Sequence, residues 1–175
     1  MALGRFCSVV ILVGVWLGAS VNTGLTAKDT ALTTSGLPVP RYVSLKSDLV
    51  NVRAGPTKDN DVAWVYTRAG LPVEITAEFE NWRRVRDSEG AEGWVYHSML
   101  SGRRTAVITM KSKDDLASLY ERADTTSEVT ARLQAGVIAQ VKRCTVGWCH
   151  ISGKGFDGWI EQQRLWGVYA DEKVD

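Results

Sequence analysis

Residues 81–100 read NWRRVRDSEGAEGWVYHSML, and residues 147–165 read GWCHISGKGFDGWIEQQRL. In both stretches a tryptophan is followed, ten or eleven residues later, by glycine, tryptophan and an aliphatic residue. The offset between the copies is 66 residues from Trp82 to Trp148 and 65 residues from Trp94 to Trp159. A repeat at a fixed spacing indicates one supersecondary unit that is used twice. We therefore expect two similar modules in tandem.

Short alternating runs on both sides of these stretches predict β-strands. Val73, Ile75 and Ala77 alternate with polar residues, which is the period of a half-buried strand. The same order of apolar runs recurs in residues 105–160. No segment after the N-terminal region has the 3.6-residue apolar period of an amphipathic helix. The predicted fold class is all-β.

The N-terminal segment predicts export. Arg5 precedes an apolar run, Phe6–Ala19, which is shorter than the ~20 residues that span a bilayer. This pattern is typical of a signal peptide, here residues 1–20, and an uncleaved membrane anchor is the alternative. Residues 21–40 predict a flexible linker, because Lys28–Pro40 is rich in Thr, Ala, Ser, Gly and Pro. The mature protein is then periplasmic or secreted, with no stable membrane insertion after cleavage.

The charge is balanced in both halves of the chain. Residues 41–104 hold ten basic and nine acidic side chains, and residues 105–175 hold nine and ten. A protein that binds nucleic acid needs a concentrated basic face. We therefore expect no nucleic-acid partner.

Three stretches of the first copy resemble a known family. GWVYHSML at 93–100 resembles the last strand and 3₁₀ turn of a Src-homology-3 (SH3) barrel, and NWRRV at 81–85 resembles its tryptophan-bearing strand. NVRAGP at 51–56 is similar to the Asn-Val-Arg-x-Gly-Pro signature of the bacterial SH3-like domain, which occurs in exported cell-envelope proteins. In the second copy, SLYERA at 118–123 replaces this signature.

The resemblance covers roughly residues 41–170 and implies two small tandem β-barrels. The first barrel would span residues 41–103, the second and more divergent one residues 104–170, and a tail residues 171–175. A domain of about 60 residues buries only about 60% of the surface that its unfolded chain exposes, so each barrel would be marginally stable alone. We therefore expect a crosslink, or docking between the barrels, to add stability.

The resemblance also implies a binding groove on the first barrel. In eukaryotic SH3 domains the matching tryptophan lines a peptide groove, together with residues of the 3₁₀ turn. Strand alternation makes Val85 the inward residue and leaves Trp82 and Arg84 on the groove side. In the alternative interpretation, arginine stems simply cover the indole of Trp82. The candidate ligand-binding residues are Arg53, Trp82, Arg84, Tyr96 and Met99.

Tyr96 stands where the eukaryotic groove has a turn proline, so a polyproline ligand is not implied. The second barrel would offer a weaker and more polar groove of Tyr120, Trp148, Glu161 and Arg164.

Several other residues have a predicted structural role. Gly55 before Pro56 suits a turn with positive φ. A glycine before a strand tryptophan allows close backbone approach or a bulge. We expect the two tryptophans of the Gly-Trp pairs to be core or barrel-closing residues, with ligand contact as the alternative. These pairs are Gly93 with Trp94 and Gly158 with Trp159.

Cys144 and Cys149 are the cysteines that remain after signal removal, and an even count in an exported chain favours a disulfide over free thiols. Their counterparts 66 residues earlier, Glu78 and Arg83, have opposite charges. If Val141 pairs with Ile151, an ideal ladder would put the cysteines on opposite faces. The disulfide therefore requires a β-bulge near the turn.

The residue inventory argues against an enzyme. The chain has two histidines, His97 and His150, and we expect no metal site and no cofactor. Cys149 and His150 are adjacent on a strand, so their side chains point to opposite faces and cannot act together. We expect a non-catalytic module that binds peptidoglycan peptides or an envelope protein. The alternative is a protein–protein interaction subunit with no cell-wall affinity.

Overall fold

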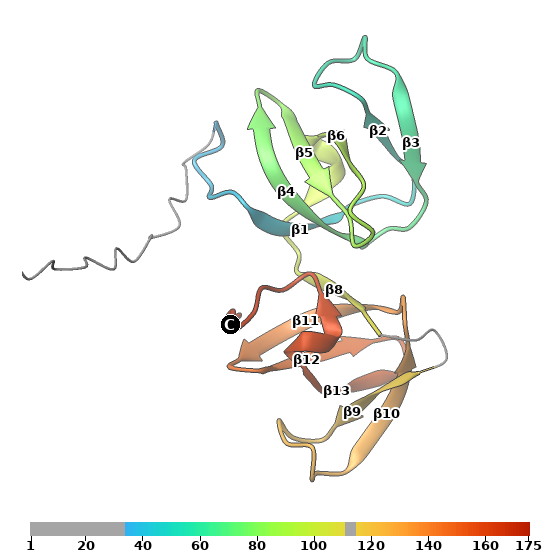
Figure 1. The fold of residues 1–175 in the computed structure, drawn as a ribbon, viewed down its shortest axis with the longest axis vertical. Coiled ribbons are helices and arrows are strands. Elements are labelled where there is room, and N and C mark those ends of the chain that lie inside the picture. Colours follow the sequence, from blue (N-terminus) through green and yellow to red (C-terminus); the bar gives the residue numbers. More distant parts are fainter. Residues whose placement is uncertain (1–33, 111–114) are drawn as a thin grey trace, which may run out of the picture.

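The computed structural model describes residues 34–110 and 115–175, which form two seven-stranded antiparallel sheets stacked one above the other (Figure 1). The first sheet comprises β1 (Arg41–Leu45), β2 (Val50–Arg53), β3 (Val62–Tyr66), β4 (Pro72–Phe79), β5 (Trp82–Arg86), β6 (Glu92–Tyr96) and β7 (Leu100–Ser101), with the 3₁₀ turn η1 (His97–Met99). The second comprises β8 (Thr105–Ile108), β9 (Leu116–Tyr120), β10 (Val129–Gln134), β11 (Ile138–Thr145), β12 (Trp148–Gly153), β13 (Phe156–Glu161) and β14 (Leu165–Trp166), with the 3₁₀ turn η2 (Gln162–Arg164).

The two sheets have the same topology. The strand order is β3-β2-β6-β5-β4-β1-β7 in the first and β10-β9-β13-β12-β11-β8-β14 in the second. Each strand of the first sheet thus has a counterpart in the second at the same place. This confirms the all-β tandem that the repeat predicted.

Each sheet curls around a core of its own. In the first, the buried cluster takes residues from β1 to β6, including Val52, Val85 and Val95, all fully buried. In the second, Ile151 and Ile160 occupy the positions of Val85 and Val95. Residues from opposite ends of the strand order can share one cluster only if the sheet rolls up.

Of the two structural roles expected for Trp94 and Trp159, core or barrel-closing, the strand pairing supports the barrel-closing one. Both are partly buried, and they lie outside the two core clusters because strand alternation turns their neighbours Val95 and Ile160 inward. Their backbones connect the strands that close each barrel. Trp94 pairs with Arg53 and joins β6 to β2, and Trp159 joins β13 to β9 in the same way.

The glycines before these tryptophans permit close approach, as expected. A Cβ on Gly93 would lie 2.4 Å from Cγ1 of Val52, and one on Gly158 would lie 2.9 Å from the carbonyl oxygen of Tyr120. The expected positive φ at Gly55 is wrong. Gly55 is required for space instead, because a Cβ there would lie 2.5 Å from Oδ1 of Asn60.

The hairpin ends of the two barrels are crosslinked at equivalent positions. Cys144 and Cys149 are directly paired across β11 and β12 and form a disulfide. A register shift between Val141 and Arg143 supplies the bulge that this pairing requires. The disulfide and its bulge are therefore both as predicted.

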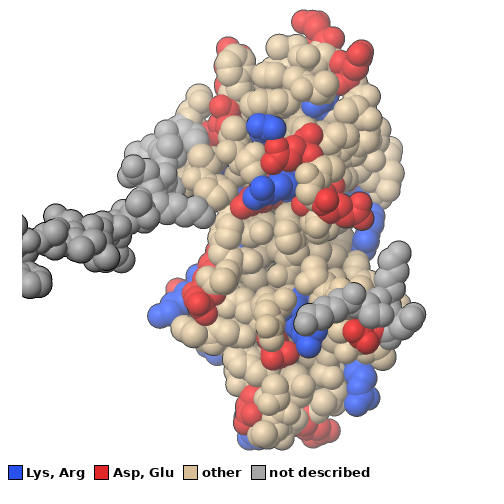
Figure 2. All heavy atoms as spheres, in the orientation of Figure 1, with Lys and Arg blue, Asp and Glu red and all other residues tan. Residues whose placement is uncertain are grey.

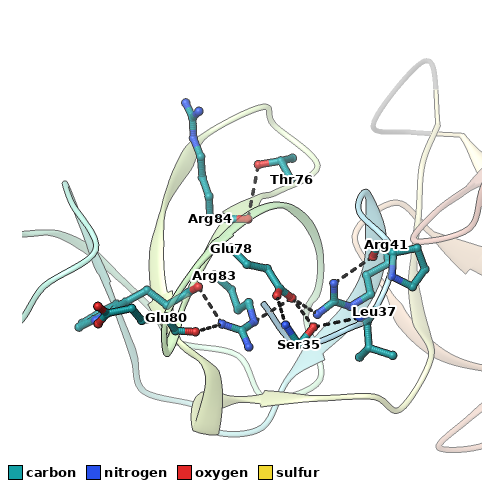
Figure 3. Close-up of polar contacts among 10 residues, drawn as sticks. Ser35, Leu37, Arg41, Thr76, Glu78, Glu80, Arg83 and Arg84 are labelled. Carbon is teal, nitrogen blue, oxygen red and sulfur yellow. Dashed lines mark hydrogen bonds and ion pairs between the residues drawn. The ribbon is translucent and has the colours of Figure 1, made fainter. Parts of the chain in front are cut away.

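In the first barrel the same place holds an ion pair. Glu78 is paired with Arg83 across β4 and β5, with Nε of Arg83 3.0 Å from Oε1 of Glu78. Arg41 adds a second contact to this carboxylate at 2.6 Å, and the Glu78 side chain is fully buried. Figure 3 shows the two arginines approaching Glu78 from opposite sides.

The segments that flank the barrels dock on these hairpins. Ser35, near the end of the expected linker, donates hydrogen bonds from its amide and hydroxyl groups to Glu78, at 2.9 and 2.8 Å (Figure 3). Val174, in the expected tail, forms an antiparallel bridge with Cys144. Residues 34–40 and 171–175 thus contact the barrels, whereas the predicted signal peptide and residues 21–33 lie outside the described residues.

Aromatic and charged side chains join the two barrels. The Tyr42 ring lies 5.1 Å from the Trp166 ring and 4.6 Å from the Tyr169 ring, measured between centroids. The Tyr169 hydroxyl donates to Glu74 at 2.9 Å, and Thr105 donates to the Gly70 carbonyl at 2.7 Å. These contacts, together called the junction, hold the barrels against each other.

Burial, with the nearby Glu74 carboxylate, raises the pKa of Tyr42 to about 12. Burial and the hydrogen bond to Glu74 raise the pKa of Tyr169 as well. Arg104 lies between β7 and β8, in the segment that connects the two barrels. It donates to both carboxylate oxygens of Glu172, at 2.7 and 3.0 Å. Burial opposes the ionisation of Glu172, but these hydrogen bonds and the Arg104 charge hold its pKa below the usual value.

Candidate functional site

A depression of about 220 Å³ opens on the first barrel beside the 3₁₀ turn η1. Its wall is formed by β2, the loop after it, β5 and the end of β6. We call it the Trp82 groove, and its lining residues are Leu49, Asn51, Arg53, Lys58, Trp82, Tyr96 and Met99. Four of the five predicted ligand-binding residues are among them.

The floor of the Trp82 groove is aromatic. Trp82 and Tyr96 are paired across β5 and β6, and their rings meet edge to face with centroids 5.4 Å apart. Trp82 is 8% exposed but does not belong to the core cluster, and Met99 at the rim is 37% exposed. The exposed parts of these side chains offer a ligand an apolar contact area.

Two cations lie at the rim. Arg53 donates from Nη1 to the carbonyl oxygen of Asn60 at 2.5 Å, which positions its guanidinium beside the groove. Neither Arg53 nor Lys58 forms an ion pair with any described residue. The groove therefore combines an apolar floor with positive charge that a ligand carboxylate could neutralise.

Arg84 is not part of this groove. It lies on the outer face of β5, with Nη2 2.6 Å from Oε2 of Glu92, and it is paired with Trp94. Its guanidinium is therefore bound by Glu92. The adjacent Arg83 points the other way, to the buried Glu78.

Sequence reasoning missed Leu49, Asn51 and Lys58. Asn51 belongs to the signature stretch, and alternation along β2 places its side chain on the face opposite the buried Val52, so this signal was available. Leu49 and Lys58 lie outside strands, and nothing in the local pattern marks them. Leu49 is 68% exposed, an unusual exposure for a leucine that fits a binding rim.

The hydrogen-bond register shows how the second barrel differs. Tyr120 pairs with Trp159 where Arg53 pairs with Trp94, and Trp148 pairs with Glu161 where Trp82 pairs with Tyr96. An arginine is thus replaced by a tyrosine, and a tyrosine by a glutamate. The Trp148 ring still meets a tyrosine edge to face, at 5.7 Å from Tyr120.

The predicted groove of the second barrel is divided into two hollows that share Glu161. Tyr120 and Arg164 line a small one of about 110 Å³. Trp148 lines a larger one of about 370 Å³, which we call the Trp148 cavity, with one wall from the C-terminal segment. Its lining residues are Gly147, Trp148, Glu161, Gln162, Gln163, Leu165, Val168, Ala170 and Asp171.

The wider surface carries both signs of charge. Acidic and basic side chains are interspersed on the face in Figure 2. Within residues 34–110 and 115–175, no group of three or more His, Cys, Asp or Glu side chains could hold a metal ion. The described part of the chain also lacks any helix long and apolar enough to cross a membrane.

A family model for the bacterial SH3 domain matches residues 46–102 and again residues 113–167. The chain belongs to the bacterial SH3 domain family. The two matched segments cover β2 to β7 of the first sheet and β9 to β14 of the second, so this is a tandem bacterial SH3 protein. Domains of this family are typically binding modules.

Among curated proteins, none matches the chain in sequence. Two solved structures with similarity are NlpC2 and NlpC1 from Trichomonas vaginalis, at 15% and 16% identity and TM-scores of 0.33 and 0.32. The similarity covers 73% and 78% of this chain. The chain spans about half of each of those structures, 48% in both cases.

Proposed function

We propose that this protein is an exported, non-catalytic module whose first barrel binds carboxylate-bearing peptides in the Trp82 groove. The peptides would belong to peptidoglycan or to an envelope protein. The observation that carries the proposal is the aromatic floor of Trp82 and Tyr96 beside two cations that no described carboxylate neutralises. An arginine can hold a carboxylate through two parallel hydrogen bonds while the aromatic rings pack against apolar parts of the ligand.

Two further observations support export and binding. The Cys144–Cys149 disulfide is typical of proteins that fold in an oxidising compartment, which agrees with the signal peptide expected over residues 1–20. The family is one of binding domains, and none of the described residues that line the groove is acidic.

The test uses the mature protein, residues 21–175, with isolated cell-wall sacculi and with short acetylated wall peptides that end in a free carboxylate. We expect retention on sacculi and measurable peptide binding. Trp82→Ala should weaken the binding of peptide by about 30-fold, the equivalent of the ~2 kcal/mol of an aromatic hot spot. Arg53→Gln should abolish the preference for the free carboxylate over the corresponding amide.

Trp94→Gln is the matched control, because Trp94 lies on the same barrel but outside the Trp82 groove. Thermal melting of every variant checks that the barrel is folded, and Trp82→Leu replaces Trp82→Ala if the latter melts early. Unchanged peptide affinity in both groove variants would contradict the proposal. Binding to an envelope protein through Trp82, with no retention on sacculi, would favour the interaction subunit instead.

A further inference from the structure

The Trp148 cavity differs from the Trp82 groove in the sign of its charge. Its polar lining includes the carboxylates of Glu161 and Asp171, and none of the described residues that line it is basic. Asp171 forms no ion pair with any described residue. Glu161 makes two long contacts, one from each carboxylate oxygen: Oε2 lies 3.5 Å from Nε of Arg164, and Oε1 accepts from the Gln163 amide at 3.2 Å.

Gln162, which lines the cavity, has a buried side-chain oxygen to which no described residue donates a hydrogen bond. Gln162 is 5% exposed, and its Nε2 donates to the carbonyl oxygens of Tyr169 and Glu172, both at 3.0 Å. These two contacts use both N–H groups and establish which end of the amide is nitrogen. The remaining oxygen, Oε1, is buried and accepts no hydrogen bond from the described residues. A buried acceptor in this state is satisfied by a donor from water or from a ligand.

The same contacts build the cavity wall. Because Gln162 holds the carbonyls of Tyr169 and Glu172, residues 168–171 stay beside the Trp148 ring. The Tyr169 amide donates to Glu172 at 2.8 Å and tightens this turn. The wall is therefore part of the folded barrel and does not have to form on binding.

From these features we infer that the Trp148 cavity binds a primary ammonium group carried on an apolar stem. The indole attracts a cation and contacts the stem, the two carboxylates balance the charge, and the Gln162 side chain lines the same cavity. The first barrel would select carboxylates and the second barrel ammonium groups. This inference does not depend on the function proposed for the Trp82 groove.

The experiment titrates the ¹⁵N-labelled mature protein with Nα-acetyl-lysine methylamide and follows the amide signals of Gly147, Gln163 and Ala170. Nα-acetyl-norleucine methylamide, which has a similar stem without the ammonium group, should bind at least roughly threefold more weakly. Alanine amide, whose only ammonium is on the α-carbon, distinguishes a chain terminus from a lysine-type side chain as the source. Binding of the lysine probe supports the inference, whereas binding of alanine amide without binding of the lysine probe would contradict the apolar stem.

Glu161→Gln and Asp171→Asn should each weaken binding of the lysine probe by roughly threefold, since both groups are partly solvated. Glu121→Gln, an exposed carboxylate of the same barrel outside the cavity, is the matched control, and Trp82→Ala should have no effect. Three results would each overturn the inference. They are equal binding of norleucine and lysine probes, lysine affinity unaltered in both carboxylate variants, and no shift of cavity signals at the solubility limit of the probes.

Discussion

Trp94 and Val95 are neighbours on β6 but lie on opposite faces of it. Val95 is fully buried in the core, whereas Trp94 is partly buried on the outer face and pairs with Arg84. The residue that must be small at this point is Gly93, which contacts Val52 across the sheet. A large aromatic residue in a repeated motif can therefore mark where two strands meet rather than where the core lies.

This difference predicts how each position tolerates a polar side chain. Trp94→Gln should lower the free energy of unfolding by about 1 kcal/mol, because the outer face remains accessible to water. Val95→Asn should lower it by about 3 kcal/mol or more, since it buries an amide with no partner. Urea unfolding followed by circular dichroism measures both. A larger loss for Trp94→Gln than for Val95→Asn would show that the indole is a core group after all.

At the scale of elements, each barrel carries a crosslink at the end of its longest hairpin. The even cysteine count of an exported chain predicted the Cys144–Cys149 disulfide, and the 66-residue offset related its two positions to the oppositely charged Glu78 and Arg83. The direct pairing of Cys144 with Cys149 depends on the register shift between Val141 and Arg143, which spacing alone does not give. The sequence could not reveal that Arg41 and Ser35 also reach Glu78, since they approach it from outside the hairpin.

A reductant should break the Cys144–Cys149 disulfide but leave the Glu78–Arg83 ion pair intact, so the two crosslinks can be tested separately. Replacing both Cys144 and Cys149 by Ala should lower the free energy of unfolding by about 2 kcal/mol, the value expected for a short closed loop. Glu78→Gln should cost about 3 kcal/mol, because it leaves Arg83 and Arg41 near a buried neutral group. Urea unfolding with and without dithiothreitol separates them. The reductant should destabilise the wild type and the Glu78 variant, whereas the double-alanine variant should not respond.

The candidate site was predictable where one hairpin supplies it. Trp82 and Tyr96 are direct partners on adjacent strands, so spacing and the family resemblance located both. The groove of the second barrel was predicted as one site but is divided in two. The wall of the Trp148 cavity depends on hydrogen bonds from Gln162 to the carbonyl oxygens of Tyr169 and Glu172. No local sequence pattern predicts contacts between the 3₁₀ turn η2 and the C-terminal segment.

At the scale of the whole molecule, the junction joins residues far apart in the chain. Tyr42 of β1 packs on Tyr169, and Tyr169 in turn reaches Glu74 of β4. The burial of individual residues near the junction could not be read from sequence, because β1, β4 and β8 bury consecutive residues instead of alternate ones. The repeat predicted two barrels in contact, and the structure adds that aromatic rings and carboxylates make the contact.

The junction should loosen in alkali. The pKa of Tyr42 is raised from its ordinary value of 10.0 to about 12 by burial and by Glu74, so the folded state favours the neutral phenol. This contribution to stability is complete below pH 10 and is lost as the pH rises toward 12. Melting temperatures across that range should fall less steeply in Tyr42→Phe than in the wild type. Tyr120→Phe, outside the junction, should follow the wild type, and identical slopes for all three proteins would contradict the assignment.

A fixed junction also sets the distance between the two candidate sites. A ligand that reaches both then binds the second site at an effective concentration determined by geometry rather than by its amount in solution. A short peptide with one carboxylate and one ammonium group cannot reach both sites, so it occupies one barrel at a time and gains no avidity. A polymer that repeats both groups at the matching interval gains avidity. With both candidate sites occupied, this protein would bind such a polymer more tightly than its soluble fragments.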